Sequence, residues 1–409
     1  MRETYDLAVV GAGAAGLVAA ISAARRGAST AVLERLPRAG KKLLATGGGR
    51  CNLLNDALSA SDYSSSEPGL VASVLGRFGA PEIRGFFEGL GLRLTSDEGG
   101  RVFPATNQAA SVLKVLELEA ARRGVVVATG FEAARIDPAP PGFVVASADG
   151  RRVGAEALVL AGGGRSYPAL GSDGSCYGLA ARFGHRVVPP VPSAVPVVVK
   201  DRWCHVLQGQ RLRVRVAGRI GGKAAAGAEG ELLFTPYGLS GTAVLDVSEG
   251  LSIALNRHGT RQTALVVDFV PFLSEDELAA ELARRMGEGW PGKDLAAGLL
   301  PEKFSLVLPE LMRETGAVPG GPAGDGGPAR ALAATLKART FAVTGTRGWN
   351  EAEFTAGGVD AREVRPRTLE SKLRDGLYFA GEVLDVQGGR GGYNLAWAWA
   401  SGFVAGLAE

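Results

Sequence analysis

The stretch YDLAVVGAGAAGLVAAISAARRGASTAVLE, residues 5–34, decides the fold of this chain. It begins with an apolar segment over 5–10, passes through closely spaced glycines, continues as an alanine-rich segment over 14–26 and returns to apolar residues over 29–33. The first and last segments have the length and composition of strands, and the middle one has those of a helix. This order predicts a βαβ unit at the start of an α/β domain.

The glycines between the first strand and the helix follow the spacing GxGxxG. Gly11 allows the tight turn, Gly13 lets a pyrophosphate approach the backbone, and Gly16 allows the helix to pack closely on the strand. The helix N-terminus adds free N–H groups and a positive dipole end. Glu34 ends the second strand, where a carboxylate can accept both hydroxyls of an adenosine ribose and disfavours a 2′-phosphate. The residues predicted to bind a dinucleotide here are Gly11, Ala12, Gly13, Ala14, Ala15, Gly16, Glu34 and Arg35.

A second glycine-rich block, KKLLATGGGRCN, occupies residues 41–52. Three successive glycines add nothing to a core, but they suit a backbone that passes close to a planar ring or a phosphate. An exposed basic loop is the alternative interpretation. Cys51, beside a basic residue, has a redox or a structural interpretation, and the structural one is favoured because no second cysteine is near in sequence. The predicted binding residues of this block are Lys42, Thr46, Gly47, Gly48, Gly49, Arg50, Cys51 and Asn52.

Two further segments end apolar strands with glycines, over 158–164 and 376–381. In the second segment Glu382 is placed to accept a hydrogen bond from a ribityl hydroxyl. The glycines at 388–392 precede a helix whose N-terminal amides favour the negative charge that builds up on a reduced flavin. The first segment lacks GxGxxG spacing, so a separate nicotinamide domain is not predicted. The binding residues predicted in the two segments are Ala161, Gly162, Gly163, Gly381, Glu382, Asp385, Gly391, Gly392, Tyr393 and Asn394.

Composition limits the remaining possibilities. The chain has 409 residues, of which 46% are hydrophobic, so we expect more than one structural unit and a soluble protein without a membrane span. Its 45 basic and 42 acidic residues form no long runs, so nucleic-acid binding is not indicated. Three widely spaced cysteines favour a reducing cytoplasm, and no metal site is predicted. The sequence pattern changes after His185, where prolines cluster and segments of alternating apolar and polar residues predict strands. From Ser274 the pattern predicts helices.

Together these blocks resemble one family, the bacterial BaiN/YhiN-like NAD(P)/FAD-dependent oxidoreductases, and the resemblance covers nearly the whole chain. It implies non-covalently bound FAD in a Rossmann-like fold of the two-dinucleotide-binding type, with an inserted β-barrel and helical region. Asp173 stands where the family usually has threonine, which indicates a divergent subgroup. The motifs that carry the resemblance are 46–52, 100–104, 230–235, 238–241, 355–359 and 376–394.

The domain boundaries follow from this arrangement. We expect a discontinuous FAD-binding domain over 1–190 and 352–409, an inserted β-rich domain over 191–272 and 337–351, and a helical insertion over 273–336.

The predicted function is a ping-pong flavin cycle in which NAD(P)H, docking transiently, supplies electrons for reduction of a small enone- or carbonyl-type substrate. One alternative is an amine or aminoketone oxidase that reduces O2, and another is a flavin-binding module within a macromolecular complex, for example in RNA modification. Tyr167, Tyr237 and Tyr393 are candidate proton donors, although packing roles are favoured and no catalytic residue is assigned. Otherwise we expect a small-molecule substrate, no nucleic-acid or membrane partner, and a monomer or homodimer.

Overall fold

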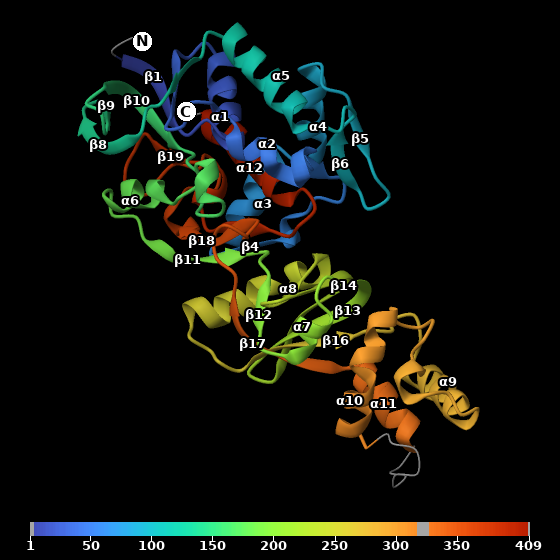
Figure 1. The fold of residues 1–409 in the computed structure, drawn as a ribbon. Helices are drawn as coiled ribbons and strands as arrows, with labels where there is room; N and C mark the ends of the chain where they lie inside the picture. Colours follow the sequence, from blue (N-terminus) through green and yellow to red (C-terminus); the bar gives the residue numbers. More distant parts are fainter. Residues whose placement is uncertain (1–3, 317–326, 408–409) are drawn as a thin grey trace. The chain divides into compact units, whose positions relative to one another are not determined.

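The computed structural model describes residues 4–316 and 327–407, which form two compact units (Figure 1). One unit combines Met1–Pro190 with Phe354–Glu409, and the other is Val191–Glu353. The first unit is therefore built from both ends of the chain around an insertion. Most of the glycine- and proline-rich run over 316–328 lies outside the described residues.

The first unit is organised by a seven-stranded sheet. Its strands are β1 (Thr4–Val10), β2 (Thr30–Glu34), β7 (Val126–Thr129), β8 (Ala133–Ala139), β9 (Gly142–Ser147), β10 (Arg152–Leu160) and β19 (Leu377–Phe379). The order is β7-β2-β1-β10-β9-β8, and β19 also pairs with β10. β7, β2, β1, β10 and β19 are parallel, whereas β9 and β8 continue the sheet as antiparallel strands.

The carboxyl ends of β1, β10 and β19 lie side by side. Val10 is opposite Leu160, and Leu160 is opposite Phe379. The glycine segments that follow these three strands in the sequence therefore start from one edge of the sheet. In open α/β sheets, ligands bind outside the carboxyl ends of the strands.

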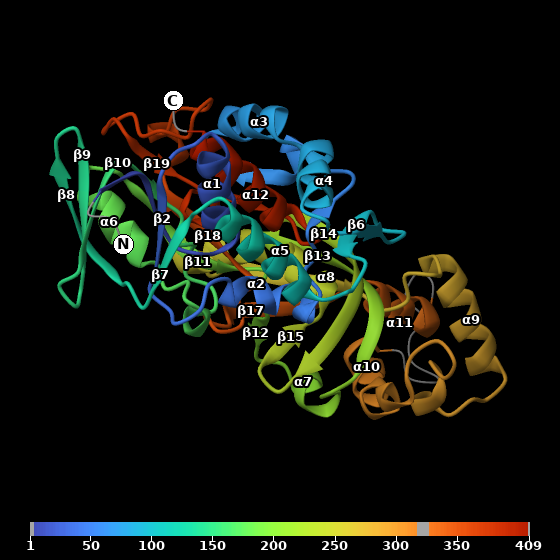
Figure 2. The same ribbon diagram turned by 90° about the horizontal axis from the view of Figure 1, so that it is seen from above.

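Helices α1 (Ala14–Arg25) and α12 (Tyr393–Gly406) pack side by side on this sheet (Figures 1 and 2). Glycines on α12 allow the close approach, since a Cβ at Gly402 or Gly406 would stand 2.3 or 2.2 Å from the carbonyl oxygen of Ala15 or Ala19. α5 (Ala109–Arg122) adds Glu119, whose carboxylate pairs with three arginines. Burial raises the pKa of the Glu119 carboxyl, but the three arginines outweigh this effect and lower the pKa to about 2.

Shorter elements complete the first unit. Three small sheets accompany the main one, namely β3-β6-β5, β20-β4 and β11-β18, and residues 187–190 of β11 belong to this unit. The elements are α2 (Lys41–Ala45), η1 (Thr46–Gly49), β3 (Leu54–Asn55), η2 (Ala60–Asp62), β4 (Tyr63–Ser65), α3 (Pro68–Arg77), α4 (Ala80–Gly89), β5 (Leu94–Ser96), β6 (Arg101–Pro104), η3 (Pro168–Leu170), α6 (Ser175–Ala181), β11 (Val187–Ser193), β18 (Phe354–Val359), η7 (Ala361–Glu363), η8 (Gly381–Val383) and β20 (Val386–Gly388).

The second unit contains a closed six-stranded barrel, in the order β12-β15-β14-β13-β16-β17. Five aromatic residues are almost fully buried in its core, namely Trp203, Phe234, Phe269, Phe304 and Phe341. The barrel strands are β12 (Val197–Val199), β13 (Arg211–Ile220), β14 (Lys223–Thr235), β15 (Gly238–Ser240), β16 (Thr263–Asp268) and β17 (Arg339–Thr346).

Helices accompany the barrel within the second unit. α9 begins with the capping box predicted from the sequence, formed by Ser274 and Glu277. The helical elements are α7 (Arg202–Val206), α8 (Thr242–Ser252), η4 (Ile253–Arg257), α9 (Glu275–Gly287), η5 (Gly292–Asp294), η6 (Glu302–Leu306), α10 (Leu308–Glu314) and α11 (Gly327–Lys337).

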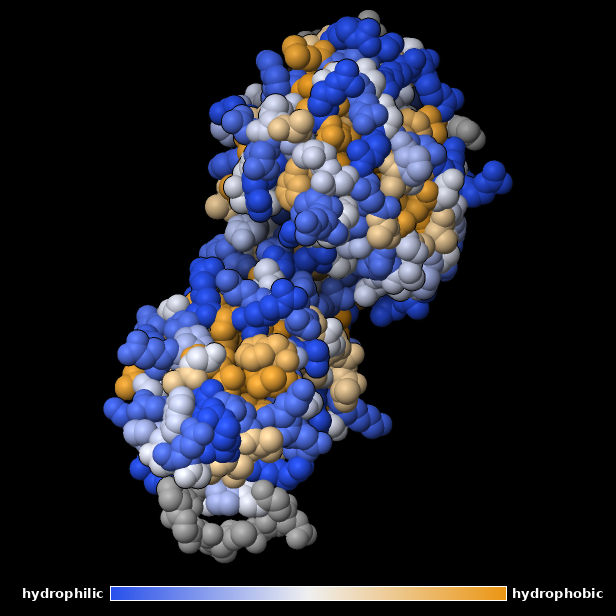
Figure 3. Space-filling model, turned by 90° about the vertical axis from the view of Figure 1, so that its right-hand side faces the viewer, coloured by the Kyte–Doolittle hydropathy of each residue, from blue (hydrophilic) through white to orange (hydrophobic). Residues whose placement is uncertain are grey.

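The surface of the second unit carries an apolar area, visible in Figure 3 among polar residues. Phe272 is 64% exposed and lines a pocket of about 250 Å³ together with Leu212, Phe269 and Leu300. Within residues 4–316 and 327–407, no helix combines the length and apolarity needed to cross a bilayer.

Candidate functional site

The three glycines of the GxGxxG turn differ in the space around them. Gly11 and Gly16 face other protein atoms closely, whereas Gly13 faces open space. A Cβ at Gly16 would stand 1.9 Å from the carbonyl oxygen of Gly11, and one at Gly11 would stand 2.6 Å from that of Ala161. These two glycines are therefore required by packing. A Cβ at Gly13, the N-cap residue of α1, would meet no atom within 4 Å. The space in front of the helix N-terminus is where a pyrophosphate would be held.

Glu34 is held by two backbone N–H groups. Its carboxylate accepts hydrogen bonds from the amides of Ala12 and Leu36, each at 2.8 Å. Each carboxylate oxygen has further lone pairs, so this anchoring leaves acceptors for ribose hydroxyls. The neighbouring Arg35 pairs with Asp173. That pair links the end of β2 to the segment that follows β10.

The segment from Lys41 to Asn52 forms α2, η1 and a turn with unusual backbone angles. Gly48 has φ 66°, in the left-handed region that favours glycine, and a Cβ there would meet nothing within 4 Å. Cys51 adopts φ 60° and is fully buried, and burial raises the pKa of its thiol to about 12. A protonated, inaccessible thiol fits the structural interpretation of Cys51. Arg50 is exposed, and its guanidinium lies 5.3 Å from the centre of the Phe103 ring.

Lys42 and Glu382 form the polar centre of this edge. The ammonium of Lys42 donates to Glu382 at 2.6 Å and to the hydroxyl of Ser166 at 2.7 Å. The other carboxylate oxygen of Glu382 accepts from the Ser166 hydroxyl at 3.1 Å and from the Thr355 amide at 2.9 Å. Burial raises the pKa of Glu382, but the charge of Lys42 and these hydrogen bonds together hold it below its usual value.

Ser166 and Thr355 are candidate site residues that were not predicted from the sequence, and both contact Glu382. Thr355 also accepts a hydrogen bond from the amide of Arg165 at 2.8 Å through its hydroxyl. The motif signal was present, because Ser166 lies in the glycine-rich segment after β10 and Thr355 in the motif over 355–359. Their contacts with Glu382 could not be predicted, because these residues are far apart in the sequence and only the fold brings them together.

The segment after β10 packs tightly on α6. A Cβ at Gly162 would stand 2.3 Å from the Cys176 sulfur, and a Cβ at Gly163 would stand 2.8 Å from the Ser172 hydroxyl oxygen. Asp173 and Gly174 form the N-terminal cap of α6. The N-cap residue is Gly174, which has no side chain, and Asp173 accepts instead from the Ser175 amide at 3.0 Å.

The N-terminus of α12 is presented by a glycine loop. Gly392, the N-cap residue, has φ 107°, and a Cβ there would stand 2.5 Å from the carbonyl group of Leu54. Asn394 holds the loop, because its side chain exchanges hydrogen bonds with the backbone of Gly388 and donates to Gly389. The first turn of α12 is therefore fixed in position with its amides directed out of the helix.

The three tyrosines considered as proton donors lie in different surroundings. Tyr393 begins α12, and burial raises the pKa of its phenol, so it is protonated at neutral pH. Its carbonyl oxygen accepts from the Tyr63 hydroxyl at 2.7 Å. Tyr167 has φ 53° and is the N-cap residue of η3, whereas Tyr237 lies in the second unit, with its ring centre 4.4 Å from the Arg347 guanidinium. Only Tyr167 and Tyr393 therefore belong to the unit that carries the glycine segments.

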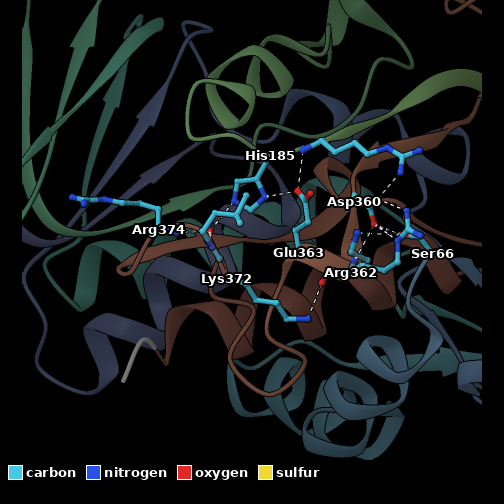
Figure 4. A network of polar contacts seen from close by, with 11 residues as sticks. Ser66, His185, Asp360, Arg362, Glu363, Lys372 and Arg374 are labelled. Carbon is cyan, nitrogen blue, oxygen red and sulfur yellow. Dashed lines mark hydrogen bonds and ion pairs between the residues drawn. The ribbon is translucent and has the colours of Figure 1, made fainter.

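His185 belongs to no catalytic or metal-binding motif in the sequence. In the structure it is part of a polar network on the first unit (Figure 4). Its Nε2 lies 2.7 Å from the hydroxyl oxygen of Ser371, and its Nδ1 lies 3.2 Å from a carboxylate oxygen of Glu363. This is the order of groups found in serine hydrolases. No spacing in the sequence indicates it, since Ser371 lies 186 residues from His185.

The hydrogen bonds of Ser371 show that the arrangement is structural. Its hydroxyl oxygen already accepts from the amides of Leu373 and Arg374, both at 2.9 Å, so its hydrogen points to His185. Ser371 is also fully buried, which excludes substrate. Asp360 in the same network accepts from the Ser66 hydroxyl at 3.1 Å and from Arg362. The network therefore anchors η7 behind β18, the strand that carries Thr355.

The comparisons with known proteins cover the chain from end to end. The family model described as HI0933-like protein Rossmann domain matches residues 5–408. The 3-dehydro-bile acid delta(4,6)-reductase of Clostridium scindens is 38% identical over 408 residues, which are 98% of each chain. The ribosomal RNA dihydrouridine synthase of Haemophilus influenzae is 31% identical over 414 residues, covering 100% of this chain and 99% of the relative.

A solved structure supports the same fold. The 3-ketosteroid delta1-dehydrogenase of Sterolibacterium denitrificans, in complex with 1,4-androstadiene-3,17-dione, superimposes with a TM-score of 0.52 and covers 99% of each chain. At 14% sequence identity this likeness concerns the fold alone. The predicted Rossmann-like fold with an inserted barrel and the predicted family resemblance are both confirmed.

Proposed function

Because this chain belongs to the HI0933-like Rossmann-domain family, whose members are flavin-dependent oxidoreductases, we propose that it binds FAD and reduces a carbon–carbon double bond conjugated to a carbonyl group, with NADH or NADPH as electron donor. The flavin, when bound, supplies the redox chemistry. The protein supplies binding, orientation and electrostatic support.

The observation that carries the proposal is the end-to-end similarity to two enzymes whose names describe related chemistry. A 3-dehydro bile acid with delta(4,6) unsaturation contains double bonds conjugated to its 3-oxo group. Dihydrouridine differs from uridine by two hydrogen atoms added across a double bond that is conjugated to a ring carbonyl. The shared chemical class is therefore an electron-poor alkene next to a carbonyl.

The residues at the strand edge fit a flavin dinucleotide. The open position at Gly13 and the N-terminus of α1 suit the pyrophosphate, and Glu34 suits the adenosine ribose. Glu382, with a pKa held low by Lys42, suits a ribityl hydroxyl. The fixed first turn of α12 suits the pyrimidine edge of the flavin, where the positive end of a helix favours negative charge.

The whole set of residues predicted from the sequence remains the proposed cofactor site. It includes Arg35, Thr46, Gly47, Gly49, Asn52, Ala161 and Asp385 in addition to the residues just described. For Cys51 the proposal concerns only its backbone, because its side chain is fully buried.

Anaerobic stopped-flow spectroscopy tests the proposal. One portion of the purified protein is denatured and its released cofactor is identified, with FAD expected rather than FMN. A second, native portion is mixed with NADH or NADPH, and the reduced protein is then mixed with a conjugated steroid enone. The matched control is the same steroid with the double bond out of conjugation. Fast bleaching by one nicotinamide and reoxidation by the conjugated steroid alone are expected.

Other outcomes contradict parts of the proposal. If neither nicotinamide bleaches the flavin, the donor is wrong. If O2 reoxidises the protein and the enone does not, the oxidase alternative replaces the reductase.

Reduction of uridine in RNA is a second candidate, which the similarity to the ribosomal RNA enzyme favours. The charge of this chain argues against it, because residues 191–353 contain 18 basic and 18 acidic residues. On β13, Arg211, Arg213 and Arg215 pair with Glu229 or Glu231. Reoxidation of the reduced protein by a ribosomal RNA fragment, with uridine alone inactive, would favour the RNA substrate.

A further inference from the structure

Two segments that leave the carboxyl edge of the main sheet are joined by their side chains. Arg35, in the segment that follows β2, forms an ion pair with Asp173, in the segment that follows β10. The next residue, Leu36, packs on the same segment, because a Cβ at Gly171 would stand 2.8 Å from its Cδ1. The two segments are therefore in contact beyond the end of the sheet.

The ion pair spans the strand that carries the GxGxxG turn. β1 lies between β2 and β10 in the sheet. A link between the segments that follow β2 and β10 therefore crosses the region beyond the carboxyl end of β1. The GxGxxG turn begins at this end, and Gly13 faces open space there. A nucleotide that extends from Glu34 to the N-terminus of α1 would lie between this link and the ends of the strands.

The electrostatics place the ion pair beside Glu34, the carboxylate proposed to bind the adenosine ribose. The hydrogen bond to Asp173 is the largest cause that raises the pKa of the Arg35 guanidinium, and the charge of Glu34 adds to it. The thiol of Cys176, which packs on Gly162, has its pKa raised mainly by burial, but the charges of Asp173, Glu34 and Arg35 also act on it. The pair is thus close both to Glu34 and to the glycine segment after β10.

The two carboxylate oxygens of Asp173 have different partners. Oδ2 pairs with Arg35, whereas Oδ1 accepts from the Ser175 amide at 3.0 Å and caps α6. A neutral side chain can cap a helix as well as a charged one, and the family usually has threonine at this position. The ion pair is therefore separable from the cap. The side chain of Arg35 is 29% exposed and that of Asp173 is 35% exposed, so solvent and salt can reach the pair.

We infer that Asp173 is a positioning residue for the cofactor: it holds Arg35 across the end of β1, and this bridge retains the adenosine half of the bound FAD. The inference rests on the proposed function, since it requires that the edge of the sheet bind a flavin dinucleotide. The bridge has to open before the nucleotide leaves. The rate of FAD release should therefore depend on the charge of Asp173 and on salt, which screens an accessible ion pair.

Asp173→Asn tests the role of this charge. Asparagine keeps an oxygen that can accept from the Ser175 amide, so the cap of α6 is retained. FAD release from the holoprotein, measured as flavin that stays with the protein after dilution, should be about threefold faster in the variant. Raising the salt to about 1 M should speed release from the wild type and change release from the variant little.

Asp137→Asn is the matched control. Asp137 pairs with Arg135 at 2.9 Å on β8, and its side chain is 38% exposed, close to the value for Asp173. β8 is the outermost strand of the same sheet, separated from β1 by β10 and β9. This variant should release FAD at the wild-type rate. Equal acceleration by the two variants would assign the effect to a general loss of negative charge and would overturn the inference.

Fragments of the cofactor separate a positioning role from a structural one. Asp173→Asn should weaken the binding of ADP about threefold and leave riboflavin binding unchanged, because the bridge lies at the adenosine half. Asp173→Glu, which keeps the charge, should restore slow release. In the Arg35→Met background, Asp173→Asn should have no further effect. If Asp173→Asn instead lowers the melting temperature of the apoprotein and weakens both fragments equally, the pair only stabilises the fold, and the inference is wrong.

The two proposals fail in different ways. A wild-type protein that binds neither FAD nor ADP would contradict the proposed function. A wild-type protein that binds FAD and releases it as fast as Asp173→Asn would contradict the role of Asp173 alone.

Discussion

The two units of this protein treat their polar groups differently. In the barrel unit, charged side chains such as Arg213 and Glu229 pair at the surface, and five aromatic residues pack with aliphatic ones in the interior. In the unit made from the chain ends, Lys42 and Glu382 pair within the fold, and the hydroxyl of Tyr177 has no partner among the described residues. Both units bury polar groups, since the barrel unit also holds the Lys337–Asp268 ion pair and the Nε1 of Trp203, which has no partner in the described part of the chain. The difference lies in position, because Lys42 and Glu382 meet at the strand edge from which the glycine segments start.

Loss of an aromatic residue from the barrel core should have the largest effect on stability and little effect on cofactor binding. Phe269 is 1% exposed and contacts the rings of Trp203, Phe234 and Phe304. Phe269→Ala should lower the free energy of unfolding of the barrel unit by about 4 kcal/mol. Denaturant titration followed by tryptophan fluorescence measures it, with FAD titration in parallel. Loss of FAD affinity in this variant would show that the two units are not independent.

Glycine substitutions in the first unit separate packing from ligand binding. Gly16→Ala places a Cβ 1.9 Å from a carbonyl oxygen and should lower the melting temperature and cost about 3 kcal/mol of stability. Gly13→Ala is the matched control, because its Cβ meets no protein atom within 4 Å. It should leave the apoprotein stable and weaken FAD binding about tenfold. Unchanged FAD affinity in Gly13→Ala would place the pyrophosphate elsewhere.

Removal of the Lys42 charge should weaken FAD binding less severely than a steric block. Lys42→Met takes the cation away from Glu382, and the pKa of that carboxyl should rise because the charge of Lys42 holds it down. FAD affinity should fall several-fold and depend more strongly on pH on the acid side. Lys41→Met is the control, since that side chain only donates to the Ala169 carbonyl oxygen at the surface. Equal effects of the two variants would contradict a specific role for Lys42.

The smallest expected effect is the pH dependence that His185 confers on the first unit. Burial lowers the pKa of His185 more strongly than Glu363 raises it. Between the lowered folded value and an unfolded value of about 6.5, the unfolded chain binds more protons. The stability due to neutral His185 is therefore complete above about pH 6.5 and is lost as the pH falls through the folded pKa.

Melting temperatures of the apoprotein across this range, compared with those of His185→Gln, measure the contribution. The neutral glutamine cannot titrate, so its melting temperature should depend less on pH. A variant whose melting temperature falls as steeply with acid as that of the wild type would assign the effect to other groups.

The parts of the fold that were predictable from sequence are those with local signals. β1, α1 and β2 follow from apolar periodicity and glycine spacing within 30 residues, and the capping box of α9 follows from Ser274 and Glu277. The candidate site was predictable as a set of glycine-rich segments. Their partners were not, because Lys42 and Glu382 are 340 residues apart in sequence.

The surroundings of His185 could not be predicted from the sequence, because they depend on tertiary contacts. His185 has no chemically suggestive neighbour along the chain, and only the packing of η7 brings Glu363 to it.

The pairing of α1 with α12 has a consequence for biosynthesis. A hydroxyl on α1, that of Ser22, donates to the carbonyl oxygen of Phe403 on α12, 381 residues later. During translation the barrel unit, a continuous segment of chain, can fold while α1 still lacks its neighbour. Binding at the proposed FAD site would therefore follow synthesis of α12, and a stalled ribosome would display the barrel unit tethered to a first unit that still lacks this helix.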